Sequence, residues 1–230
     1  MGSLASVPTL RLALAQIDAT VGDLAGNAAL IRVHVASAVA AGADLVAFPE
    51  MALTGYPVED LALRPSFRRA SAAAVARLAA DLQADGLGAA ICLVGYLDDV
   101  EGPVNALAVL HRGTVIARYI KHHLPNYGVF DEARHFRHGE EPVHLRIADT
   151  TVTLAICEDL WQPGGPVTWA REASAGLLIA VNASPYERNK DDVRLDLCRT
   201  RAREAGCPIA YVNLVGGQDE LVFDGDSMVV

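Results

Sequence analysis

The chain has 230 residues, a mass of 24.3 kDa and a formal net charge of −9. Apolar residues make up 52% and charged residues 20%, which excludes a disordered or fibrous protein and allows one large domain with a full core. The net negative charge argues against a nucleic-acid partner, because phosphate backbones attract a basic surface. Although mean hydropathy is +0.25, no apolar run reaches the roughly 18 to 20 residues of a membrane span, so we expect no membrane partner.

The amino-terminal residues 1–8 have neither the basic start nor the apolar centre of a secretory signal. We expect them to form a flexible leader to one domain over 9–230, whose apolar end suggests truncation inside a longer protein. The four cysteines form no CxxC pair, which argues against a zinc ribbon or a thioredoxin-like dithiol. The sequence therefore predicts a cytoplasmic protein with free thiols.

The first third of the chain predicts two strands and two helices. Residues 10–16 are apolar on both faces, which is typical of a buried strand. A helix follows, with Asn27 as its expected N-cap and Gly42 at its C-terminal cap. Residues 44–48 predict a second buried strand. A second helix over 66–84 carries one apolar face, formed by Ala70, Ala74, Leu78 and Leu82.

The rest of the chain predicts hairpins followed by a return to alternating elements. Short apolar runs separated by turn residues predict strands at 90–96, 104–110, 114–120, 143–147 and 150–156. A helix between Pro166 and Gly176, a strand at 177–182, a helix over 189–206 and a strand at 209–213 follow, with two short strands after residue 219. Helices and strands in this order indicate an α/β sandwich.

Three polar side chains come directly after predicted buried strands. Glu50, Lys121 and Cys157 each occupy such a position, where open α/β sheets place their functional sites. Taken singly, each has an ordinary interpretation as a loop acid, a surface charge or a core thiol. Together they supply what amide hydrolysis needs, because a thiol requires a base to remove its proton and a cation to stabilise an oxyanion.

A Cys/His pair is the competing interpretation of the same cysteine. His122, His123, His135 and His138 are available, but none of them follows a predicted buried strand. His135 and His138 could share a helix face and bind a metal, yet no third ligand stands at a recognisable spacing, so we expect no metal site. The arginines are interpreted as the solvated face of a helix, at positions 194, 199, 201 and 203.

Four sequence blocks make the chain recognisable. They are FPEMALTGYPVEDLALRPSF at 48–67, KHHLPNYGVFDEARHF at 121–136, CEDLWQPGGP at 157–166 and NASPYERNKDDVR at 182–194. In this order they resemble the nitrilase superfamily of carbon-nitrogen hydrolases, and within it the glutaminase part of glutamine-dependent NAD synthetases. The resemblance implies a four-layer α-β-β-α sandwich.

The resemblance also implies a role for each matching residue. Cys157 would be the nucleophile, Glu50 the general base and Lys121 the cation that stabilises the oxyanion. The pocket would be formed by Tyr56, Tyr127, Phe130, Glu132, Glu158, Ser184 and Lys190. The three aromatic residues could equally be ordinary packing. Arg194 is an alternative to Lys190 for holding the substrate carboxylate, since a guanidinium offers a bidentate fork.

The expected activity is release of ammonia from L-glutamine for a synthetase domain that this sequence lacks. No cofactor is expected in this chain; ATP and magnesium would serve only that absent domain. The resemblance further implies a homo-oligomer. Two other functions remain open: a stand-alone amidase or carbamoylase with the same three residues, and a non-catalytic module that keeps the fold for assembly.

Overall fold

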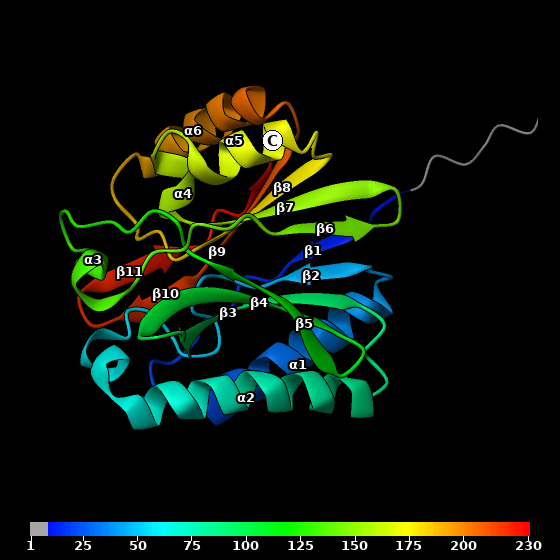
Figure 1. Ribbon diagram of the computed structural model, residues 1–230, viewed down its shortest axis with the longest axis vertical. Helices are drawn as coiled ribbons and strands as arrows, with labels where there is room; N and C mark the ends of the chain where they lie inside the picture. Colours follow the sequence, from blue (N-terminus) through cyan, green and yellow to red (C-terminus); the bar gives the residue numbers. More distant parts are fainter. Residues whose placement is uncertain (1–8) are drawn as a thin grey trace, which may run out of the picture.

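The computed structural model describes residues 9–230, and the expected leader at 1–8 lies outside the described residues. Two five-stranded sheets form its centre (Figure 1). The first has the order β1 (Leu12–Leu14), β2 (Leu45–Ala47), β3 (Ile91–Asp99), β4 (Pro103–His111) and β5 (Thr114–Ile120). The second has the order β12 (Met228–Val229), β9 (Ile209–Asn213), β8 (Leu177–Asn182), β7 (Thr150–Ile156) and β6 (His144–Ile147). A separate hairpin pairs β10 (Val215–Gln218) with β11 (Leu221–Asp224).

Helices cover the outer face of each sheet. The first sheet packs on α1 (Leu24–Ala40) and α2 (Pro65–Ala84), which follows the 3-10 turn η1 (Glu59–Leu63). The second packs on α5 (Gly165–Glu172) and α6 (Lys190–Ala205). Two single-turn helices, α3 (Glu132–His135) and α4 (Glu158–Trp161), lie near the ends of the strands.

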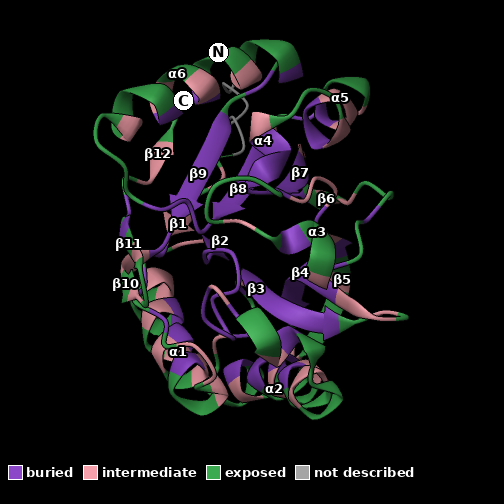
Figure 2. Ribbon diagram, turned by 90° about the vertical axis from the view of Figure 1, so that its left-hand side faces the viewer, coloured by how far each residue is buried: buried purple, intermediate pink, exposed green. Residues whose placement is uncertain are grey.

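Three apolar cores separate these four layers. One lies between the first sheet and α1 and α2, one between the two sheets, and one between the second sheet and α5 and α6. The middle core joins side chains of both sheets, such as Leu107 and Val109 of β4 with Leu154 and Ile179 of β7 and β8. Figure 2 shows the buried strands between helices that are exposed on their outer sides. The α-β-β-α sandwich is therefore confirmed.

The strand directions bring the candidate residues to one edge of the sandwich. Strands β1, β2 and β3 are parallel, and so are β7, β8 and β9. Two antiparallel pairings, β3 with β4 and β4 with β5, return β5 to the direction of β2. The ends of β2 and β5 therefore lie at the same edge of the first sheet, which is the geometry that open sheets use for their sites.

The structure corrects two local predictions, the N-cap of α1 and the buried face of α2. Asp23, not Asn27, caps α1, because its carboxylate accepts a hydrogen bond from the backbone of Gly26. Asn27 is buried in the helix, where its amide pairs with the backbone of Thr20 and Leu53. On α2, Ala70 is exposed and Val75 is buried instead.

Gly42 does follow the end of α1 with a positive φ of 83°, as predicted for a helix cap. All four cysteines are free and buried. Among the described residues, no helix is both long enough and apolar enough to cross a membrane.

Candidate active site

Lys121 lies directly after β5 and forms the centre of a buried charge cluster. Its Nζ donates to Glu50 Oε1 at 2.6 Å and to Glu132 Oε2 at 2.7 Å, and its side chain is only 1% exposed. Glu50 follows β2 and Glu132 opens α3. Glu50, Lys121 and Glu132 thus meet in one buried cluster. Two carboxylates around one ammonium give the cluster a net negative charge when all three are ionised.

Glu50 is held by further groups that sequence reasoning did not find. Asn105 Nδ2 donates to Oε1 at 2.7 Å, and the backbone N–H of Ala183 donates to Oε2 at 2.9 Å. Ala183 follows β8, so this carboxylate bridges the two sheets. The loop that carries Glu50 also needs Gly95, because a Cβ there would lie 2.4 Å from the carbonyl oxygen of Pro49. In the sequence, this role of Asn105 could have been suspected because Asn105 is the one amide side chain within the apolar strand β4.

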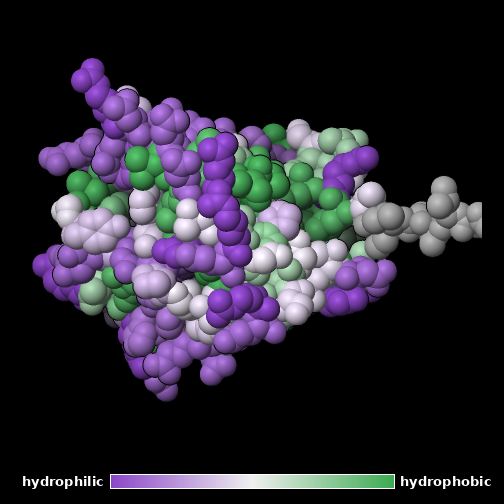
Figure 3. Space-filling model, turned by 90° about the horizontal axis from the view of Figure 1, so that it is seen from above, coloured by the Kyte–Doolittle hydropathy of each residue, from purple (hydrophilic) through white to green (hydrophobic). Residues whose placement is uncertain are grey.

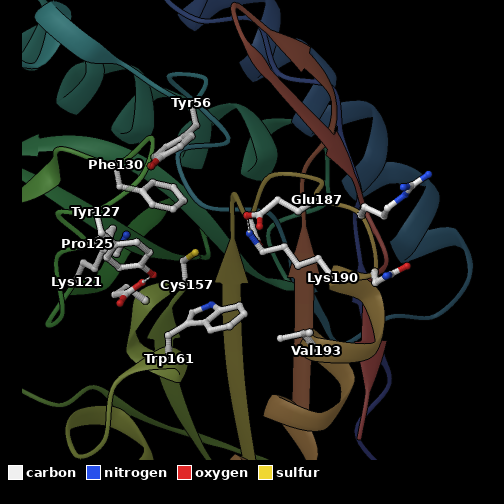
Figure 4. Close-up of a pocket in the computed structure, with 14 residues that line it drawn as sticks. Tyr56, Lys121, Pro125, Tyr127, Phe130, Cys157, Trp161, Glu187, Lys190 and Val193 are labelled. Carbon is white, nitrogen blue, oxygen red and sulfur yellow. Dashed lines mark hydrogen bonds and ion pairs between the residues drawn. The ribbon is translucent and has the colours of Figure 1, made fainter.

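Cys157 occupies a sharp turn between β7 and α4. Its φ of 42° and ψ of −92° are unusual for a residue with a side chain, and its N–H donates to Val181 O at 2.9 Å. Strained backbone of this kind concentrates at functional sites, where the surrounding fold fixes the side chain. The side chain of Cys157 points into a cavity that Lys121 also lines (Figure 4). The nucleophile and cation candidates therefore face the same space.

The charges around Cys157 keep it as a neutral thiol in the resting site. Burial and the nearby Glu50 raise the pKa of Cys157 well above its ordinary value, although Lys121 opposes this shift. Burial alone would lower the pKa of Lys121, but Glu132 and Glu50 more than offset it, so this pKa lies well above its ordinary value. Lys121 is therefore an ammonium, and the Cys157 proton has to leave as the thiol reacts.

The cavity has a volume of about 310 Å³, which suits a small ligand. One side of the cavity is formed by aromatic residues, two of which are tyrosines that donate hydrogen bonds to glutamates. Tyr56 donates to Glu132 Oε1 at 3.0 Å, and Tyr127 donates to Glu158 Oε2 at 2.8 Å. Phe130 lies between these two phenols in Figure 4 and packs edge-on against Tyr127. Tyr56, Tyr127, Phe130 and Glu158 thus all line the cavity.

The cavity is also lined by Ser184 and Lys190. Ser184 follows β8 and is fixed by Asn213, which accepts from its N–H at 2.9 Å. Lys190 pairs with Glu187, beside which it lies in Figure 4. Its Nζ is 5.9 Å from the ring centroid of Trp161. The side chain of Lys190 lies across the cavity from the aromatic wall.

Arg194 is close by but does not line the cavity. It is fully buried, and its guanidinium donates to Asp224 at 2.8 and 2.9 Å and to the carbonyl oxygens of Ser184 and Pro185 at 2.9 Å each. Of the two cations considered for a substrate carboxylate, only Lys190 faces the cavity. Arg194 holds the backbone of Ser184 without entering the cavity. The prediction that Arg194 lies on a solvated helix face is therefore wrong.

The prediction of a solvated helix face is also wrong for Arg201. It donates to the backbone oxygens of Leu160 and Trp161, at 2.6 and 3.2 Å. These are the last residues of α4, so α6 helps to hold the short helix that follows Cys157.

The histidines lie outside this cavity. His122 Nδ1 is 2.6 Å from Gly139 O, and its ring packs against Trp169 at a centroid distance of 4.9 Å. None of the four candidate histidines lines the space around Cys157. The geometry therefore favours the Glu50–Lys121–Cys157 arrangement over a Cys/His pair. Within residues 9–230, no group of three or more histidine, cysteine or acidic side chains is placed to hold a metal ion.

Comparison with known proteins identifies the family. Residues 11–230 match the carbon-nitrogen hydrolase family. The chain is 44% identical over 96% of its length to the glutamine-dependent NAD(+) synthetase of Aquifex aeolicus, and 45% identical over 96% to that of Rhodobacter capsulatus. It spans only 38% and 39% of those two relatives.

Solved structures agree with this match. The glutamine-dependent NAD+ synthetase of Acinetobacter baumannii superimposes with a TM-score of 0.88 at 33% identity, over 96% of this chain and 41% of that one. The amidase of Nesterenkonia sp. AN1, with acrylamide added at its active-site cysteine, gives 0.82 at 28% identity, over 96% and 85%. With the family match extending over almost the whole described chain, the protein belongs to the carbon-nitrogen hydrolases of the nitrilase superfamily.

Proposed function

We propose that this chain is a glutamine amidohydrolase that releases ammonia from L-glutamine through a thioester on Cys157. The observation that carries the proposal is the buried Glu50–Lys121–Glu132 cluster together with a strained cysteine, Cys157, that shares a cavity with Lys121. The relatives named glutamine-dependent NAD(+) synthetases support glutamine as the substrate.

The cavity offers partners for both ends of glutamine. Glu158 suits the α-ammonium group, because its carboxylate lies at the cavity wall and is oriented by Tyr127 and by Gln162 Nε2 at 2.7 Å. Lys190 and Ser184 suit the α-carboxylate. The side-chain amide then extends between the aromatic residues toward Cys157. A site with fixed charged partners discriminates strongly against analogues that lack those groups.

The first half of the reaction forms the thioester. Cys157 Sγ attacks the amide carbon while its proton passes to Glu50, which agrees with a raised thiol pKa. Lys121 stabilises the oxyanion that forms. Two of the three N–H groups of Lys121 donate to Glu50 and Glu132, so one N–H group has no protein partner among the described residues and can donate to the oxyanion. Glu50 then gives the proton to the nitrogen, the C–N bond breaks, and ammonia leaves.

The second half restores the enzyme. Glu50 takes a proton from water, the resulting hydroxide equivalent attacks the thioester carbon, and Lys121 again stabilises the oxyanion. The C–S bond breaks, the proton returns to Cys157 and glutamate leaves. These steps draw on the chain's own side chains and water.

In a longer protein, we propose that the ammonia passes to a synthetase domain, where ATP and magnesium would act. The match to about two-fifths of each relative supports a partner domain of this kind. A homo-oligomer and a cytoplasmic location remain predictions of the sequence. A size-exclusion measurement with light scattering tests the first of these.

Ammonia release from glutamine tests the activity itself. We expect wild-type protein to release ammonia and the C157A variant to lose activity by about 10⁴-fold or more, because removing a covalent nucleophile removes the pathway. The matched control is C198A, which removes another buried thiol away from the cavity. Equal activity of C157A and wild type would contradict the proposal.

A stand-alone amidase is the second candidate, favoured by the match to 85% of the Nesterenkonia amidase. Comparing kcat/KM for glutamine with that for propionamide separates the two functions. We expect glutamine to be preferred by several orders of magnitude. A preference for propionamide would assign the amidase function instead. Release of ammonia from neither substrate would favour the non-catalytic module.

A further inference from the structure

Asp159 is a fully buried carboxylate two residues beyond the nucleophile candidate, and the proposed reaction does not use it. It lies in α4, outside the residues that line the cavity. A buried carboxylate is costly unless hydrogen bonds satisfy it, so its partners show what it does. All of them belong to segments that carry Cys157 or Lys121.

One oxygen of Asp159 connects the two sheets. Its Oδ2 accepts from the Tyr119 hydroxyl at 2.6 Å and from the backbone N–H of Ile156 at 2.8 Å. Tyr119 is in β5 of the first sheet, and Ile156 ends β7 of the second sheet. Tyr119 precedes Lys121 by two residues, and Ile156 directly precedes Cys157. This oxygen therefore connects the strand that leads to Lys121 with the strand that leads to Cys157.

The other oxygen holds the segment beyond Lys121. Its Oδ1 accepts from the backbone N–H of His123 at 2.8 Å, and the His123 ring Nδ1 lies 3.4 Å from it. Asp159 thus contacts the chain two residues before and two residues after Lys121. Burial and Asp159 also raise the pKa of Tyr119, which keeps its hydroxyl as a donor to the carboxylate.

We propose that Asp159 is a positioning residue that fixes the Lys121 ammonium relative to the Cys157 thiol by fastening β5 to the β7–α4 turn. The two side chains come from different sheets, and the middle core between those sheets is apolar and not directional. Hydrogen bonds are directional, so those that converge on the Asp159 carboxylate fix the orientation of β5 relative to the β7–α4 turn. Catalytic geometry is sensitive at this scale, since a misplacement of about 1 Å can cost roughly 100-fold in rate.

The D159N variant removes this function with little change of shape. A carboxamide has one oxygen, whereas the N–H groups of Ile156 and His123 approach different oxygens of Asp159. In either orientation an NH₂ group faces one backbone N–H and repels it. One of the two functional segments is therefore released.

Alkylation of Cys157 by iodoacetamide measures the consequence without any assumption about the substrate. The second-order rate is followed against pH, and peptide mapping separates Cys157 from the other three cysteines. We expect D159N to slow alkylation by about 100-fold at neutral pH and to shift the pH profile. Y119F, which deletes one hydrogen bond to Asp159, should slow it by about fivefold.

Y96F is the matched control. Tyr96 also donates to a buried aspartate at 2.6 Å, Asp98, and neither residue lines the cavity. It should lower the melting temperature as Y119F does yet keep alkylation within about twofold of wild type, because sites without shared partners act independently. Folded D159N and Y119F variants with wild-type alkylation profiles would overturn the proposal. If D159N does not fold, the contrast between Y119F and Y96F decides, and equal alkylation by the two would overturn it.

Steady-state kinetics adds a second readout, which rests on the proposed glutaminase function. We expect Y119F to lower kcat and to leave KM for glutamine within about threefold, because an interaction that matters only in the transition state acts on kcat. A change in KM alone would overturn positioning of the reacting groups. A wild-type protein that is alkylated rapidly at Cys157 but releases no ammonia would contradict the glutaminase, while the alkylation contrast would still test Asp159.

Discussion

Lys121 and Arg194 are both buried cations at the ends of the sandwich, but they differ in how their donors are used. Arg194 directs its N–H groups to Asp224, to two carbonyl oxygens and, at 3.3 Å, to Ser184 Oγ. Lys121 directs two of three N–H groups to carboxylates and lines the cavity. A fully satisfied cation can only hold structure, whereas a cation with a remaining donor can bind a developing negative charge.

Their acidic partners differ as well. The guanidinium of Arg194 meets one carboxylate, which keeps part of its surface in water. The ammonium of Lys121 meets two carboxylates that are nearly as buried as itself. The two carboxylates at the second site raise the pKa of Lys121 and keep it as an ammonium. Burial alone therefore does not identify a catalytic cation; the sum of charges and the access to a cavity do.

Among the charged residues compared here, replacing Lys121 with methionine should have the largest effect on activity. We expect K121M to lower kcat for ammonia release by about 10³-fold, because a preorganised donor to the oxyanion is removed. Burial already raises the pKa of Glu132 to about 7, so this carboxyl group can take up a proton in the absence of Lys121, and we expect a folded variant by circular dichroism. A folded K121M protein with wild-type kcat would remove the distinction between the two cations.

Replacing Arg194 with methionine should instead act on stability. We expect R194M to lose about 3 kcal/mol of unfolding free energy, the lower end for breaking a buried ion pair, since Asp224 remains partly solvated. Denaturant unfolding measures this loss. The kcat of the folded fraction should change far less than in K121M, and a larger loss of kcat than of stability would assign Arg194 to the reaction.

Most strands and helices, and the positions of Glu50, Lys121 and Cys157 after strands, follow from local sequence patterns, whereas the four-layer order was implied by the resemblance to the nitrilase superfamily. Apolar runs and turn residues are local, and a parallel sheet brings strand ends together once its strands are known. Asn27 shows the limit of this reasoning. Asparagine is typical of a helix cap, but Asn27 lies within α1 and donates a hydrogen bond to the backbone of the distant Leu53.

The polar ties between distant segments could not be predicted in the same way. Arg194 and Arg201 lie on a helix rich in charged residues, so periodicity gave no indication that either would be buried or half-buried against another segment. Asn105 and Asp159 likewise owe their importance to partners on other elements. Hydrogen-bond partners across the fold depend on three-dimensional packing, which a single sequence shows only through isolated polar residues in apolar surroundings.

Lys190 is a third cation, which lines the cavity without contacting the central cluster. We expect K190M to raise KM for glutamine about 10- to 100-fold, the cost of one hydrogen bond to a charged group, with little change in kcat. The control is R199M, an exposed position on the same helix. An unchanged KM in K190M would exclude it as the carboxylate partner.

Glu132 gives the smallest expected effect and tests why Lys121 needs two carboxylates. Burial raises the pKa of Glu132 from its ordinary 4.5 to about 7, against the opposing charge of Lys121. Activity should therefore rise as pH increases through about 7 and the second carboxylate ionises. In E132Q this rise should be absent, with kcat about tenfold below wild type at pH near 8 and nearly equal at pH near 6.

Stability should move in the opposite direction as pH rises toward 7. A carboxyl group whose pKa is raised by folding binds a proton more tightly in the folded protein, so its stabilising contribution is full below pH 4.5 and is lost as pH rises to about 7. The unfolding free energy of wild type relative to E132Q should fall across this window while relative kcat rises. Parallel changes in both quantities would mean that Glu132 maintains the fold around Lys121 and does not tune its charge.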